Sequence, residues 1–234
     1  SLAKVMQALK AVETGLDASR TVDLGVSAGI TADGLAPFLR KHAALAGVNA
    51  AVTQGGFDDP LGDMTRFAAQ GVTHVVLMPF LDAVLPHLES RAATLDAAEL
   101  EAKAADFSAR YTLALQQAAR FDTVFVCGLH RITRAPGGDE DAVQQLLARF
   151  NGLLRAVVQA HANAKWIDTG GIVNQISLDA ALDARFFYRA KAPYTPRFMD
   201  ALASAISVAS RGFGTYFYKC LVLDCDNTLW GGII

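Results

Sequence analysis

The chain has 234 residues, a formal net charge of −2, 52% hydrophobic residues and 19% charged residues. Such a composition is typical of a globular protein with a substantial core, and the nearly balanced charge argues against a nucleic-acid partner. Its apolar stretches are shorter than the about 20 residues that span a bilayer, and its amphipathic start is unlike a signal peptide. We therefore expect a cytoplasmic protein with no membrane partner.

Short apolar runs rich in β-branched residues alternate with amphipathic stretches along most of the chain. The runs predict strands at 21–26, 48–53, 74–78, 123–127 and 165–168. The amphipathic stretches predict an opening helix within 1–16 and further helices at 33–46, 61–70, 96–118, 143–157 and from 195 onward. Strands separated by single helices favour right-handed crossovers, so we predict an α/β fold with a doubly wound parallel sheet of about five strands.

The end of the chain reads KCLVLDCDNTLWGGII, in which an apolar run at 221–223 predicts one more buried strand. Asp224 and Asp226 follow this strand directly, at the end where open α/β sheets bind ligands. Two carboxylates at this spacing suit Mg²⁺, and the first could instead attack a phosphoryl group. Asn227 and Thr228 then bend the chain, where backbone N–H groups and the Thr228 hydroxyl could hold phosphate oxygens.

These residues resemble motif I of the haloacid dehalogenase (HAD) superfamily, an apolar strand followed by Asp-x-Asp-x-Thr. The longer string DCDNTLWGG resembles the FkbH-like branch of that superfamily. The resemblance implies that Asp224 is the nucleophile and a metal ligand, that Asp226 is the acid/base, and that Thr228 is the motif's threonine. It also implies Mg²⁺ as cofactor and a phosphorylated glycerate, 1,3-bisphosphoglycerate, as substrate. The glyceryl group would be loaded onto an acyl carrier protein in polyketide-type biosynthesis.

The FkbH-like pattern needs further motifs downstream, namely a Ser or Thr, a Lys and more acidic metal ligands. None follows Ile234 in this sequence, so we expect the chain by itself to have no phosphatase or transferase turnover. Residues 210–218, rich in glycine and aromatic residues, indicate a domain boundary. The expected organisation is an amino-terminal helix at 1–16, an α/β domain at 17–212, and the start of a truncated HAD-like phosphatase domain at 216–234.

The α/β domain resembles the SGNH-hydrolase-like module that precedes the phosphatase domain in FkbH-like proteins, including in the string RFFYRAKAPYTPRF. An SGNH hydrolase needs a serine after its first strand, and Ser27 stands there. Leu81 stands where the oxyanion-hole asparagine is expected, and Tyr188 and Lys191 stand where the Asp-x-x-His pair is expected. Because a serine hydroxyl is a weak nucleophile without a neighbouring base, we interpret Ser27 as a turn residue.

A third candidate site is the loop GLHRITR after the strand at 123–127. His130, Arg131 and Arg134 lie there, at the ligand-binding edge of the predicted sheet, and could contact an anion or a phosphopantetheine group. Two other functions stay open: a non-catalytic module that docks a carrier protein or partner domains, and an esterase that uses Ser27.

Overall fold

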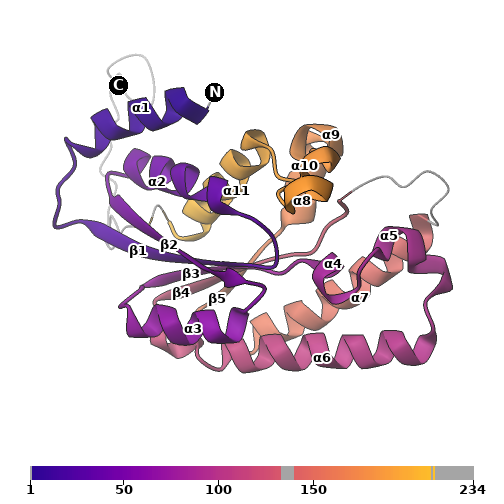
Figure 1. The fold of residues 1–234 in the computed structure, drawn as a ribbon. Coiled ribbons are helices and arrows are strands. Elements are labelled where there is room, and N and C mark those ends of the chain that lie inside the picture. Colours follow the sequence, from indigo (N-terminus) through magenta and orange to yellow (C-terminus); the bar gives the residue numbers. More distant parts are fainter. Residues whose placement is uncertain (1, 133–139, 212, 214–234) are drawn as a thin grey trace, which may run out of the picture.

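The computed structural model describes residues 2–132, 140–211 and 213, and its centre is one five-stranded sheet (Figure 1). The strand order is β2-β1-β3-β4-β5 and every neighbouring pair is parallel. The predicted fold class is therefore confirmed. Within the described ranges, none of the helices combines the length and apolar character that crossing a bilayer demands.

The strands lie where the apolar runs predict them, but the first two extend further than predicted. Their bounds are β1 Thr21–Ala28, β2 Asn49–Phe57, β3 His74–Met78, β4 Thr123–Cys127 and β5 Ala164–Ile167. The second strand is longer than the predicted 48–53 because it continues through Gly55 and Gly56. Glycine pairs usually favour a turn, but here β2 stays in register with β1 up to Gln54 and pairs again at Phe57. The strand that we predict at 221–223 lies outside the described residues.

Helices cover both faces of the sheet in a three-layer arrangement (Figure 1). One layer holds α2 and α11, with the short helices α8, α9 and α10, and α1 packs outside α2. The opposite layer holds α3, α6 and α7. The bounds are α1 Leu2–Glu13, α2 Ala36–Leu45, α3 Pro60–Ala69, α4 Leu81–Val84, α5 Leu88–Arg91, α6 Ala97–Leu115, α7 Glu140–Gln159, α8 Thr169–Ile176, α9 Leu178–Ala181, α10 Ala184–Ala190 and α11 Pro196–Ala209.

Side-chain hydrogen bonds cap the first turns of α6 and α11, two of the helices that the sequence predicts. Asp96 accepts hydrogen bonds from the backbone N–H groups of the first turn of α6. Thr195 accepts one from Phe198, and Pro196 occupies the first turn of α11. These caps fix where each long helix begins relative to the sheet. The short helices α8, α9 and α10 were not predicted, since none is long enough to show a clear 3.6-residue period.

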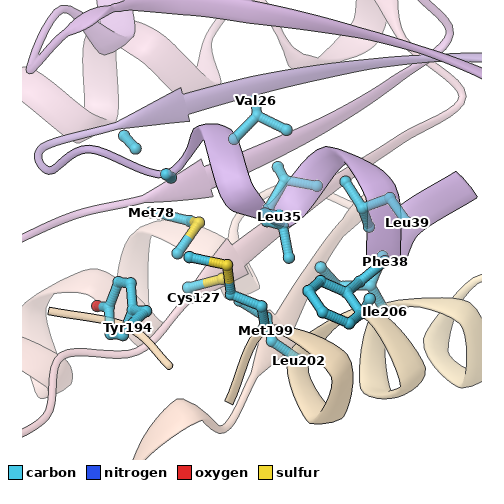
Figure 2. Packing of buried hydrophobic residues seen from close by; sticks show 14 of the residues in the cluster. Val26, Leu35, Phe38, Leu39, Met78, Cys127, Tyr194, Met199, Leu202 and Ile206 are labelled. Atoms are coloured by element: carbon cyan, nitrogen blue, oxygen red, sulfur yellow. The ribbon is translucent and has the colours of Figure 1, made fainter. Parts of the chain in front are cut away.

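Each face of the sheet has its own hydrophobic core. Even-numbered residues of β1, such as Val26, pack toward α2 and α11. Figure 2 shows Met78 and Cys127 of the sheet meeting Met199 of α11 in this core. The residues of α11 that face this core include Met199, Leu202, Ala203 and Ile206, all of them buried.

Odd-numbered residues of β1 face the other layer, where Phe67 of α3 covers Gly25. A Cβ added at Gly25 would lie 2.6 Å from the Phe67 ring, which is itself 1% exposed. The contact with Phe67, and not a turn, therefore explains why a glycine is needed at position 25. The strand continues past the predicted end at residue 26, since residues 25–28 belong to β1.

We predict that Gly25→Ala lowers the free energy of unfolding by about 1–3 kcal/mol, because the added methyl group overpacks the contact with Phe67. Gly152→Ala is the matched control: its Cβ meets nothing within 4 Å in α7, so it should raise stability by about 0.5–1 kcal/mol. Chemical denaturation of the two variants measures both effects. Equal effects of the two substitutions would contradict this packing.

Candidate functional site

Ser27 lies within β1, one residue before its end, and its side chain is buried. The residue is 3% exposed and pairs with Leu77 of β3 in the sheet register. Its Oγ donates a hydrogen bond to Oδ2 of Asp63 in α3, over 2.6 Å. The interpretation of Ser27 as a turn residue is therefore wrong: its hydroxyl bridges the sheet to a helix.

Asp63 holds the centre of this network, and sequence reasoning missed it. Its side chain is fully buried, and Oδ1 accepts hydrogen bonds from the Gly56 N–H, over 2.7 Å, and from Arg66 Nη2. A Cβ on Gly55 would collide with the carboxylate, so the Gly55–Gly56 pair of β2 makes room for it. The sequence does contain two hints of this role. Asp63 stands four residues after the capping Asp59, and a glycine pair, Gly55–Gly56, precedes the helix.

Arg66 carries the network from the interior to the surface. Its guanidinium, whose side chain is 48% exposed, contacts Asp63 and also Oδ2 of Asp59, at 2.9 Å. The hydrogen bonds that Arg66 donates to Asp63 and Asp59 raise the pKa of its guanidinium above the usual value. Burial alone would raise the pKa of Asp59, but hydrogen bonds from Gly62 and Arg66 outweigh burial and lower it. Arg66 and Asp59, which form the outer ion pair, are therefore both charged at neutral pH.

The crevice between the ends of β1 and β3 is filled. In this strand order the topological switch point lies there, where α/β sheets commonly bind ligands. A Cβ at Gly29 would come within 3.1 Å of Phe80 and Asp58, and the Phe80 ring packs on Phe187 at 5.7 Å. Leu81, at the position expected for an asparagine, is 4% exposed. Buried apolar side chains thus line this crevice.

Lys191 and Tyr188 do not supply a base to Ser27. Lys191 has a left-handed backbone, with φ of 51°, and its Nζ lies 3.7 Å from Asp82 Oδ2 and 4.3 Å from the Phe187 ring centre. Tyr188 is 71% exposed on α10. Neither side chain is an imidazole, and the described partner of the Ser27 hydroxyl is Asp63.

His130 is brought together with Tyr194 rather than with Ser27. Its Nδ1 donates a hydrogen bond to the Arg131 carbonyl oxygen, over 2.7 Å, and its Nε2 lies 3.1 Å from the Tyr194 hydroxyl oxygen. The ring also packs on Phe198. Burial raises the pKa of Tyr194, which keeps its hydroxyl protonated at neutral pH. These partners lie in the α11 layer, so His130 and Ser27 face opposite sides of the sheet.

A second residue with nucleophilic chemistry, Cys127, is also buried in the core. Cys127 ends β4 and is 2% exposed, and burial raises the pKa of its thiol to about 12. Among the described residues, no group of three or more His, Cys, Asp or Glu side chains is arranged to hold a metal ion. The predicted Mg²⁺ and phosphate residues, Asp224, Asp226, Asn227 and Thr228, lie outside the described residues, as does Arg134.

An open cavity of about 570 Å³ lies beyond the carboxyl ends of β4 and β5. The loop after β4, the helix α7 and the helix α8 with its flanking residues form its walls. His130 and Arg131, two of the predicted site residues, line it. Smaller cavities of about 460 and 230 Å³ lie beside α9 and α10 and at the ends of β1 and β2.

Comparisons with known proteins identify the fold. No protein-family model and no curated protein sequence matches the chain. One matching solved structure is the N-terminal part of the protein BF1531 from Bacteroides fragilis, which contains a phosphatase domain and is complexed with Mg. It has a TM-score of 0.74 and 17% identity, over 100% of this chain and 62% of that one. The chain therefore spans less than two thirds of that protein part.

Two lipolytic proteins match at lower scores but over nearly their whole length. The lipase Lip_vut3 from a goat rumen metagenome has a TM-score of 0.55 and 14% identity, over 81% of this chain and 96% of its own. A member of the lipolytic G-D-S-L family from Veillonella parvula has a TM-score of 0.52 and 16% identity, over 82% and 99%. The chain has the SGNH-like α/β fold of these lipases. At such identities the likeness shows the fold and not the activity.

We predict that Asp63→Ala lowers the free energy of unfolding by about 3–5 kcal/mol, since it leaves the Ser27 hydroxyl and the Gly56 N–H without their acceptor and leaves Arg66 with Asp59 alone. Ser27→Ala should cost less, about 1–2 kcal/mol, because Asp63 keeps its other two donors. Urea denaturation measures both. A cost below 1 kcal/mol for Asp63→Ala would show that the carboxylate does not hold the sheet to α3.

Proposed function

We propose that the chain is a region of an FkbH-like glyceryl transferase/phosphatase. Such an enzyme would remove phosphate from 1,3-bisphosphoglycerate and load the glyceryl group onto an acyl carrier protein in polyketide-type biosynthesis. The motif at Asp224 and Asp226 supports the phosphatase half of this proposal. The shared fold with a protein part that contains a phosphatase domain and binds Mg supports it further.

The main observation behind this proposal is that the Ser27 hydroxyl is buried and bonded to Asp63. A hydrolase of this fold needs an exposed serine with a base beside it, yet here the hydroxyl is buried and donates to Asp63. The domain at 17–212 is therefore proposed to keep the hydrolase architecture without its ester chemistry. Its role is to support the phosphatase-type domain that begins at 216–234 and to receive the carrier protein.

In this proposal the chemistry belongs to the residues after the last predicted strand. Asp224 attacks the phosphoryl group, and Asp226 protonates the leaving oxygen and later activates water. Asp224 and Asp226 would hold Mg²⁺, which would supply positive charge against the phosphate, and Asn227 and Thr228 would bind phosphate oxygens.

A second candidate is a non-catalytic docking module that positions partner domains. Two exposed aromatic residues of α10, Phe186 and Tyr188, favour it, since they are 54% and 71% exposed. Aromatic residues are enriched in protein interfaces. Carrier-protein binding separates the two candidates, because the docking of partner domains alone requires no affinity for a carrier.

The test uses the natural full-length parent, incubated with Mg²⁺, 1,3-bisphosphoglycerate and candidate carrier proteins. We predict a glyceryl mass increment on one carrier by mass spectrometry, and its loss in Asp224→Asn. The 234-residue chain assayed in parallel should give no increment. Phosphate release without acylation of any carrier would contradict glyceryl transfer and indicate a plain phosphatase.

A further inference from the structure

The segment that follows α11 is fixed at the amino ends of the strands. Lys165, near the start of β5, donates a hydrogen bond from Nζ to the carbonyl oxygen of Ala209, the last residue of α11, over 2.7 Å. Arg211 and Phe213 both have φ of 54°, in the left-handed region that often ends a helix. The Phe213 N–H donates to Oγ of Ser210, over 3.0 Å. The chain therefore turns back toward the sheet as soon as α11 ends.

Aromatic contacts hold Phe213 at this amino edge of the sheet. Phe213 is 7% exposed, and its ring meets His74, the first residue of β3, edge to face with 5.9 Å between the ring centres. His74 in turn stacks on Phe125 of β4, with 6.2 Å between the ring centres. Burial lowers the pKa of His74, so its ring packs without a charge at neutral pH. Phe213 therefore anchors the point from which the chain leaves the domain.

Two exposed apolar side chains lie at the same edge, on helices α2 and α11 of one layer (Figure 1). Leu45 is the last residue of α2 and is 73% exposed, and Val208, the last but one of α11, is 76% exposed. Lys41 and His42 of α2 both pair with Asp200 of α11, at 2.7 Å. Leu45 lies one turn beyond Lys41 on the same face of α2, and Val208 lies two turns beyond Asp200. Both side chains are therefore placed where the seam between α2 and α11 reaches the amino edge.

The covalent chain determines what can cover these two side chains. Exposed apolar residues are common and by themselves indicate no partner. An extended chain spans at most about 3.6 Å per residue, so the phosphatase-type domain expected from residue 216 must begin within about 11 Å of Phe213. A domain tethered so closely has a high effective concentration at this edge, so even a weak contact with Leu45 and Val208 would be occupied.

We propose that the amino edge of the sheet, with Leu45 and Val208 beside the anchored Phe213, is the surface on which the phosphatase-type domain docks. This inference rests on the proposed function, which supplies that domain. The docked domain lies at the opposite end of the strands from the crevice beyond β1 and β3 and from the cavity of about 570 Å³ beyond β4 and β5. Docking therefore leaves the carboxyl edge of the sheet open to other molecules.

Thiol labelling of the natural full-length parent and of the 234-residue chain tests this surface. Leu45→Cys and Val208→Cys each place a thiol at an exposed position, so both variants should keep the fold. We expect maleimide labelling at both positions, read by peptide mass spectrometry, to be at least tenfold slower in the parent than in the 234-residue chain. Leu113→Cys is the matched control, since Leu113 is 47% exposed on α6 in the opposite layer, and its labelling rate should be the same in both proteins.

Equal labelling rates at positions 45 and 208 in the parent and in the 234-residue chain would overturn the docking surface. Protection that appears in the 234-residue chain as its concentration rises would also overturn it, because a second copy would then cover the surface. Protection of the parent that requires an added carrier protein would do the same. In the parent, Phe213→Ala should remove at least threefold of the protection, because His74 no longer holds the outgoing chain. Unchanged protection would overturn Phe213 as the anchor.

The same variants separate this inference from the proposed function. Protection of Leu45→Cys and Val208→Cys in a parent that loads no glyceryl group would support the docking surface and reject the transferase. Glyceryl loading by a parent in which both thiols react as fast as in the 234-residue chain would support the transferase and overturn the docking surface.

Discussion

The buried carboxylate of Asp63 is the constraint on which this domain depends. A buried charge is costly unless hydrogen bonds satisfy it, and Asp63 takes them from β1, β2 and its own helix through Ser27, Gly56 and Arg66. The network fixes α3 against the edge of the sheet. It also holds the Ser27 hydroxyl, at the position where the sequence predicts the serine of an SGNH hydrolase, in the interior of the domain.

The crevice beyond β1 and β3 and the cavity beyond β4 and β5 lie at the same edge of the sheet but differ in what occupies them. Phe80 and Phe187 occupy the space beyond β1 and β3, and Lys191 pairs with Asp82 where a catalytic pair would lie. The loop after β4 is instead held by the His130–Tyr194 contact, which leaves the cavity between α7 and α8. A fold shared with lipases therefore says little about activity here, because activity depends on which side chains occupy the edge.

The strands and the long helices could be predicted from the sequence because their hydrophobic periods are long and their caps are clear, as at Asp96 and Thr195. The site could not. Gly25, Ser27 and Gly29 together suggest a turn. Instead, Gly25 makes room for the ring of Phe67, and Ser27 donates a hydrogen bond to the buried Asp63. Both reasons involve residues about 40 positions away, which a local pattern does not reveal.

The most direct test of the sealed serine is mass spectrometry of the chain after treatment with a fluorophosphonate probe, with an active GDSL lipase as positive control. This account predicts no adduct on Ser27, because the hydroxyl is buried and donates its proton to a carboxylate rather than to a histidine. A stoichiometric adduct on Ser27, abolished in Ser27→Ala, would contradict it and would restore an esterase function to this domain.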